Sequence, residues 1–201
     1  MTNPPPDPSI DGNPQGIGFW ALVGEDRRTQ EEGVWSPGFW VLFWHRFGNR
    51  RMGWPKPLRA PATLLYKLAY RRCRIAYGID LPYTVRVGRR VRLDHSGGMI
   101  LVAERIGDEV TLRQNTTLGI KRVEGEHQRP VLGARADIGA GAVIVGGVSV
   151  GADALVGANA VVTKDVPPGA VAAGIPAKVI AQAAPGEVGA ALPDQARSNR
   201  K

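Results

Sequence analysis

Aliphatic residues recur every six positions through the second half of the chain, and this period constrains the fold more than any other feature. The register slips by one residue after Leu93, and a longer interruption follows Leu118. Three six-residue units make one triangular coil of a parallel β-helix, in which the aliphatic side chains point inward and stack on the next coil. The aliphatic positions are Leu81, Val87, Leu93, Ile100, Ile106, Leu112, Leu118, Leu132, Ile138, Ile144, Val150, Val156 and Val162.

The placement of aromatic residues agrees with a narrow prism in this part of the chain. All five Trp, four Phe and four Tyr lie at or before Tyr83. The residue four places after an aliphatic start is small or branched, as at Val91, Ala136 and Ala154. Because a narrow prism has no room for rings, the sequence predicts a mainly β fold, a parallel β-helix, after a helical N-terminal region.

The composition divides the chain into four parts. We expect a disordered Pro-rich segment at residues 1–16, a helical region at 17–79, the β-helix at 80–180 and a disordered tail at 181–201. An excursion loop at 119–131 interrupts the β-helix. No apolar run is long enough to span a membrane and no signal peptide is visible, so we expect a cytoplasmic protein.

Two apolar segments of the helical region predict helices. The first runs from Gly38 to Phe47 and the second from Leu58 to Tyr77. The second is amphipathic and basic, and we expect its apolar side to pack inside the protein; peripheral contact with a membrane or a partner is the alternative. Apolar residues recur in it near helical spacing at Leu64, Leu65, Leu68, Ile75 and Ala76.

The net charge of +8 is concentrated in one part of the chain. From His45 to Arg92 there are 13 Lys or Arg and one acid, Asp80. Such a block is either a solvated face or a contact for nucleic acid, an anionic membrane or a phosphorylated cofactor. We expect no nucleic acid, because Trp40 and Trp44 fit helix packing better than base stacking.

Cysteine and histidine content limits the chemistry further. The single Cys73 excludes an intrachain disulfide and lies in no nucleophile motif, so we expect it to be a packing residue. The three His residues lack zinc-type spacing, and we expect no metal.

The first break in the repeat carries His95. It lies at a turn, followed by Gly97 and Gly98, which permit an irregular corner. An imidazole there suits general-base work on a hydroxyl. Two carboxylates are placed to orient this imidazole: Asp80, which lies fifteen residues earlier and about one coil away, and the adjacent Asp94. The alternative is that His95 is a surface histidine at a bulge.

The second break is the excursion, which carries His127 and Arg129. Leu118 and Leu132 are 14 residues apart where the period requires 6. Loops on rigid scaffolds often carry function. A plain insertion with solvated charges is the alternative.

At residues 36–180 the chain resembles the serine acetyltransferases, a family of hexapeptide-repeat acyltransferases. The helical segment from Gly38 to Arg46 resembles the end of that family's helical domain. The motifs that carry the resemblance are Asp80-Leu81-Pro82, Asp94-His95-Ser96-Gly97, Gln114-Asn115-Thr116-Thr117-Leu118-Gly119 and Gly174-Ile175-Pro176-Ala177-Lys178.

This resemblance implies a left-handed β-helix, a homotrimer, and transfer of an acetyl group from acetyl-CoA to a hydroxyl of a small acceptor. It implies that His95 is the general base, that Asp80 orients it and that Asp94 contacts the acceptor. The positions that match the groove for acetyl-CoA are Ala140, Ala158, Ala173 and Lys178.

The chain departs from the family at two places. Where the family has Arg-His-Pro in the excursion, with the Arg binding the carboxylate of serine, this chain has Gln128-Arg129-Pro130, and His127 is the nearest histidine. The helical region is shorter, and Asp26 is the candidate for the family's acceptor-binding acid. The departures resemble short members of surface-polysaccharide clusters, so the acceptor is L-serine or, alternatively, a sugar. A non-catalytic β-helix scaffold is the second alternative.

Overall fold

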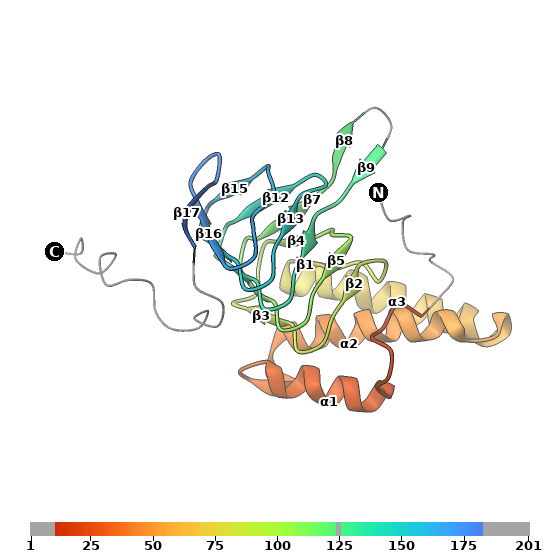
Figure 1. Cartoon of the computed structure of the whole chain (residues 1–201). Coiled ribbons are helices and arrows are strands. Elements are labelled where there is room, and N and C mark those ends of the chain that lie inside the picture. Colours follow the sequence, from red (N-terminus) through yellow and green to blue (C-terminus); the bar gives the residue numbers. More distant parts are fainter. Residues whose placement is uncertain (1–10, 124–125, 183–201) are drawn as a thin grey trace.

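The computed structural model describes residues 11–123 and 126–182 and shows a helical layer against one end of a parallel β-helix (Figure 1). Sequence periodicity predicted both parts, and both are confirmed. The helices are α1 (Phe19–Thr29), α2 (Pro37–Arg50) and α3 (Lys56–Tyr77), with 3-10 turns at Gly33–Trp35 and Arg51–Gly53.

Three parallel ladders form the faces of the prism. Their strand orders are β1-β4-β7-β12-β15, β2-β5-β10-β13 and β3-β6-β11-β14-β16, and β17 adds to β16 in antiparallel orientation. The strands are β1 (Ile79–Asp80), β2 (Arg86–Val87), β3 (Arg92–Asp94), β4 (Met99–Leu101), β5 (Arg105–Ile106), β6 (Thr111–Arg113), β7 (Thr117–Gly119), β8 (Lys121–Val123), β9 (Glu126–Gln128), β10 (Val131–Leu132), β11 (Asp137–Ile138), β12 (Val143–Val145), β13 (Ser149–Val150), β14 (Leu155–Val156), β15 (Val161–Val162), β16 (Ala170–Ala173) and β17 (Lys178–Gln182).

The aliphatic positions stack through the prism as the period predicted, with one correction. Twelve of the thirteen are buried, but Ile100 is 46% exposed. In its place Leu101, fully buried, pairs in register with Leu118. The corner before β4 is two residues longer than the corresponding corner before β7, so the slip after Leu93 is larger than one residue and turns Ile100 outward.

Local sequence signals set the limits of the helices beside the β-helix. Ser36 begins α2, accepting a hydrogen bond from the Gly38 N–H (3.2 Å), and Pro37 fits the first turn. Gly78 ends α3 with φ +63°, a left-handed conformation that favours glycine. The chain then enters β1 directly, so α3 lies against the first coil.

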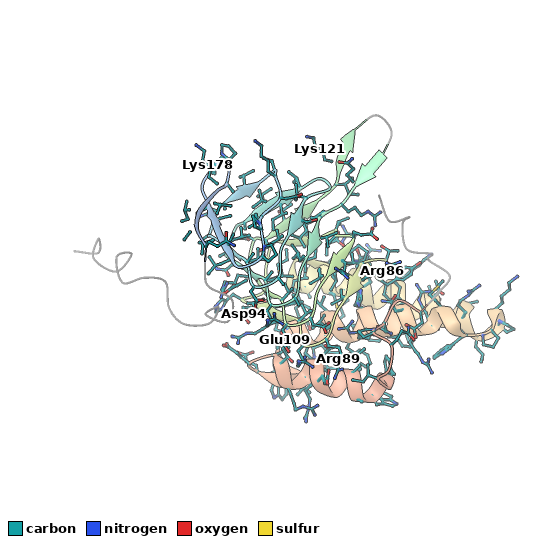
Figure 2. The ribbon with its side chains drawn as sticks, viewed as in Figure 1. Arg86, Arg89, Asp94, Glu109, Lys121 and Lys178 are labelled. Atoms are coloured by element: carbon teal, nitrogen blue, oxygen red, sulfur yellow. The ribbon has the colours of Figure 1, made fainter. Side chains whose placement is uncertain are left out.

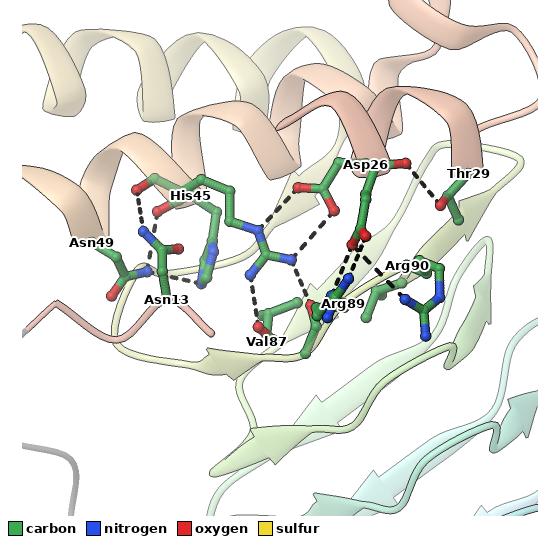
Figure 3. Close-up of polar contacts among 12 residues, drawn as sticks. Asn13, Asp26, Thr29, His45, Asn49, Val87, Arg89 and Arg90 are labelled. Atoms are coloured by element: carbon green, nitrogen blue, oxygen red, sulfur yellow. Dashed lines mark hydrogen bonds and ion pairs between the residues drawn. The ribbon is translucent and has the colours of Figure 1, made fainter. Parts of the chain in front are cut away.

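Buried polar side chains of α2 satisfy the open edge of that coil (Figure 3). Arg46 donates to the carbonyl oxygens of Val87 (2.7 Å) and Gly88 (2.6 Å), and its Nε forms an ion pair with Asp26 of α1 (3.0 Å). His45 Nε2 donates to the Val85 carbonyl oxygen at 2.9 Å. Unpaired backbone groups at a sheet edge need partners when they are buried, and these side chains replace a missing coil.

Gln30, at the end of α1, caps the neighbouring strand in the same way. Its Nε2 donates to the Val91 carbonyl oxygen (2.9 Å), and its Oε1 accepts from the Leu93 N–H (3.2 Å). The side-chain amide thus supplies one donor and one acceptor, as a neighbouring strand does. This contact fixes the end of α1 directly beside β3.

Part of the segment expected to be disordered is packed against α2. The Gly12 N–H donates to Asn49 Oδ1 (3.2 Å), and Asn13 Nδ2 donates to the Arg46 carbonyl oxygen (2.9 Å). The two segments expected to be disordered are 1–16 and 181–201, and residues 1–10 and 183–201 of them lie outside the described residues. Within 11–16, Gly12 and Asn13 thus have hydrogen-bond partners on α2, and the bounds of the expected segment stay a prediction.

The side of α3 that faces the protein also differs from the expectation. Its buried residues are Ala62, Tyr66, Ala69 and Cys73, whereas Leu64, Leu65, Leu68 and Ile75 are 50–74% exposed. The two alanines and the cysteine let the helix approach its neighbours closely, and the leucine side then points outward. Burial raises the pKa of the Cys73 thiol to about 11, which agrees with a packing role.

None of the helices in the described part of the chain combines the length and apolar character needed to cross a bilayer.

The burial of His45 predicts a loss of stability in mild acid. Burial lowers the pKa of His45 from 6.5 to about 3. Between these two pH values the imidazole is therefore protonated in the unfolded chain and neutral in the folded chain. Stability from this residue is complete above pH 6.5 and falls as the pH drops toward 3. Between pH 7 and 5 we expect a loss of about 2 kcal/mol.

Urea denaturation at the two pH values measures this loss. The matched variant His45→Gln keeps a donor near Val85 but cannot titrate, and we expect its loss to be clearly smaller. Equal pH dependence for the two proteins contradicts the assignment.

Candidate active site

The corner that carries His95 is an enlarged version of a corner that repeats in other coils. Gly98, Asn115, Gly141 and Asn159 occupy this corner in successive coils, all with φ between 57° and 72°. A side chain at Gly98 would lie 2.3 Å from Asn115 Oδ1, so a larger residue there has to displace the Asn115 side chain. His95 belongs to the extra residues of the first coil, also with positive φ (54°), and its side chain is exposed.

A cavity of about 150 Å³ lies between this corner and the helical layer. The β-helix contributes Asp94, His95 and Ser96, and the segment that joins α1 to α2 contributes Glu31 and Glu32. The wall of this cavity therefore holds three carboxylates and one imidazole. This arrangement favours a ligand that carries a cationic group, and the imidazole can accept a proton from it.

Asp94 is held in place by an arginine beside it on β3. Arg92 Nε lies 2.7 Å from Asp94 Oδ1, and its terminal nitrogen lies 2.8 Å from Glu31 Oε1. The Asp94 side chain is 12% exposed and that of Glu31 69%. Arg92 thus joins the β-helix half of the cavity to the helical half.

Asp80 lies near this corner but its partners come from α3. It accepts a hydrogen bond from the Tyr70 hydroxyl and lies 3.4 Å from Arg74 Nε. Burial and the bond to Asp80 raise the pKa of Tyr70 above its ordinary value. Among the described residues no hydrogen bond joins Asp80 to His95, although both lie near this corner.

The excursion is an antiparallel hairpin that projects from the β-helix (Figure 1). In it Arg122 pairs with His127, and Lys121 pairs with Gln128, whose side chain lies near Gly147. The side chain of His127 lies outside the described residues. Of the described side chains in the excursion, neither Gln128 nor Arg129 lines the cavity at His95. Within the described part of one chain, Gln128 and Arg129 are therefore not brought to the cavity at His95.

The residues expected to bind acetyl-CoA form one continuous row. A side chain at Gly139 would lie 2.5 Å from the Ala158 nitrogen, and one at Gly157 would lie 3.1 Å from the Ala173 Cβ. Ala173 pairs with Lys178 on β17. The Asn159 N–H donates to the Ala140 carbonyl oxygen, so Ala140 lies one coil below Ala158 in the same row.

This row continues the corner of His95 into later coils, because Gly141 and Asn159, the neighbours of Ala140 and Ala158, follow Gly98 and Asn115 in that corner. Figure 2 shows how far the row extends from the first coil. Lys178 lies at the end of the β-helix remote from the helices, and Asp94 lies beside them.

Sequence reasoning missed two acidic residues of the cavity and the arginine that pairs with its carboxylates, and it misassigned one residue. Glu31, Glu32 and Arg92 stood in no motif, and only the turn between two helices hinted that Glu31 and Glu32 face the β-helix. Asp26, the candidate for the acceptor-binding acid, is fully buried against Arg46. Burial raises the pKa of Asp26, and its place under α2 excludes contact with an acceptor in this cavity.

Comparison with curated proteins finds serine acetyltransferases. The chain is 37% identical over 150 residues to the serine acetyltransferase of Mycobacterium tuberculosis, covering 74% of this chain and 63% of that protein. It is 46% identical over 105 residues to probable serine acetyltransferase 2 of Oryza sativa, covering 52% of this chain and 30% of that protein. The chain thus spans less than two thirds of the length of these relatives. No family model matches.

Solved structures of the same kind resemble the fold. Soybean serine acetyltransferase apoenzyme aligns with a TM-score of 0.66 and 29% identity over 81% of this chain and 69% of that chain. The Neisseria gonorrhoeae enzyme aligns with a TM-score of 0.69 and 26% identity over 84% and 68%. A second soybean structure is described as complexed with serine.

Proposed function

Because the chain belongs to the serine acetyltransferase family, we propose that it transfers an acetyl group from acetyl-CoA to the hydroxyl of a small acceptor, with L-serine as the first candidate. The observation that carries this proposal is the cavity where His95 meets Asp94 and the two glutamates of the helical layer. We place the reaction in the cytoplasm, where acetyl-CoA is available.

The proposed reaction is direct transfer. His95 accepts the proton of the acceptor hydroxyl, and that oxygen attacks the carbonyl carbon of the thioester. The carbon–sulfur bond breaks, and the proton returns from His95 to the leaving thiolate. Backbone amides near the corner stabilise the negative charge on the carbonyl oxygen. No acyl group is attached to the protein at any stage.

Asp80 is proposed as the residue that positions His95, and Asp94 as a contact of the acceptor. The exposed imidazole has no partner of its own among the described residues, which leaves a place for a carboxylate. Such a contact requires Asp80 to accept a hydrogen bond from His95 beside the one that it accepts from Tyr70. Asp94, Glu31 and Glu32 supply negative charge for the ammonium group of an amino-acid acceptor.

The row of small residues suits acetyl-CoA, which supplies the acetyl thioester. Ala140, Ala158 and Ala173 leave the backbone open to an extended pantetheine arm, and the exposed Lys178 is placed to meet a phosphate as a point charge. On one chain Lys178 lies at the end of the β-helix remote from the helices, and neither Gln128 nor Arg129 lines the cavity at His95. We therefore propose a homotrimer in which a neighbouring copy completes each site.

A sugar hydroxyl is the second candidate acceptor. Two features favour it: Gln128 and Arg129 stand where the family has Arg-His, and Arg92 places a cation beside Asp94. An arginine fork binds a carboxylate or a phosphate, and nucleotide sugars carry phosphates.

Replacement of His95 by alanine tests the chemistry. We expect the release of CoA from acetyl-CoA, measured with serine, homoserine and nucleotide sugars, to fall by about 10²-fold or more. Asp80→Asn removes orientation but leaves the base, so its loss is expected to be smaller. Equal rates for the wild type and His95→Ala would exclude this mechanism.

Exchange of the excursion residues tests the acceptor. In Gln128→Arg/Arg129→His the carboxylate-binding arginine returns to the family's position, about 3.5 Å along the chain from where Arg129 stands. We expect a lower Michaelis constant for serine in this variant, measured by acceptor kinetics. A wild-type Michaelis constant for serine already below the millimolar range means that the departure is harmless.

A further inference from the structure

The outer side of α3 carries an exposed apolar stripe that nothing in the described part of the chain covers. Its members Leu58, Leu64, Leu65, Leu68 and Ile75 keep 50–74% of their surface exposed. Residues 64, 65, 68 and 75 project from one side of a helix, away from the side that is buried. Exposed apolar patches on this scale mark interaction sites.

The charges of α3 are all of one sign. The helix carries six Lys or Arg and no acid. Within the described residues, only Arg74 of these six forms an ion pair, with Asp80 at 3.4 Å. Arg72 lies within the apolar stripe itself. A partner for this face must therefore offer an apolar layer and negative charge together.

An aromatic row leads to the beginning of this helix. Neighbouring ring centroids from Trp40 through Phe43, Trp44 and Phe47 to Trp54 are 5.1–6.0 Å apart. Trp54 stands two residues before α3 and is 36% exposed. Indole rings favour the boundary between apolar and aqueous phases, where the ring contacts apolar groups and the N–H donates a hydrogen bond to water.

We propose that α3 docks the protein on an anionic membrane surface. The leucines enter the boundary of the acyl chains, and the Lys and Arg side chains reach the headgroup phosphates. A second copy of the chain fits this face less well, because it would oppose two helices that carry only positive charge. This docking surface is separate from the proposed acetyl-transfer site, and the proposal does not depend on acetyl-transfer activity.

Co-sedimentation of the full chain with vesicles tests the proposal. We expect binding to phosphatidylcholine vesicles that contain phosphatidylglycerol to be at least about tenfold tighter than to phosphatidylcholine alone, and to weaken with salt. In Leu64→Gln/Leu65→Gln/Leu68→Gln the affinity should fall by at least about tenfold. The control Val179→Gln/Ile180→Gln removes exposed apolar side chains from β17 (47% and 67% exposed) and should bind as the wild type.

A second variant, Arg71→Gln/Arg72→Gln, removes charge and keeps the leucines. It should lose most of the preference for anionic vesicles, and circular dichroism checks that every variant is folded. Absence of binding to anionic vesicles, or a leucine variant that binds as the wild type, overturns the proposal. So does a change of oligomeric state in the leucine variant without vesicles, since the stripe is then an interface between copies.

Discussion

The first coil of a parallel β-helix has no strand on one side, and the way its free edge is satisfied determines the rest of this structure. Arg46, His45 and Gln30 supply the hydrogen bonds that a further coil would have supplied. Asp26 neutralises the buried guanidinium. Removal of one partner of such a buried pair costs about 3–5 kcal/mol, because a charge is then left without compensation. The helical layer is therefore fixed on the β-helix by polar contacts of defined geometry.

The candidate active site follows from that fixed layer. Gln30 bonds to both Val91 and Leu93, which places the adjacent Glu31 and Glu32 over the end of β3. On the other side, the enlarged corner turns His95 out of the prism toward them. Arg92 then spans the two halves through Asp94 and Glu31. One side of the cavity is a solenoid corner and the other is the turn between two helices.

The sequence period predicted the core well, because each coil repeats the same steric demand. The prediction failed at Ile100, because the six-residue period does not reveal that a corner has gained two residues. Leu101 therefore points inward in place of Ile100. On α3 the apolar residues were taken for the buried face, but packing selected Ala62, Ala69 and Cys73, which permit close approach. No sequence motif marks Glu31 and Glu32 as cavity residues, because their position depends on how the helical layer packs against the β-helix. His95 and Asp94 were predictable because they interrupt a regular repeat.

We propose above that the chain forms an acetyl-transfer site that a neighbouring copy completes with its excursion. Mixed trimers of His95→Ala and Arg129→Ala subunits, purified through two different tags, test it most directly. In a cyclic trimer, either mixture contains one interface with both an intact His95 and an intact Arg129, so about one third of the wild-type activity should return. Mixed trimers no more active than the two parent variants would contradict the account.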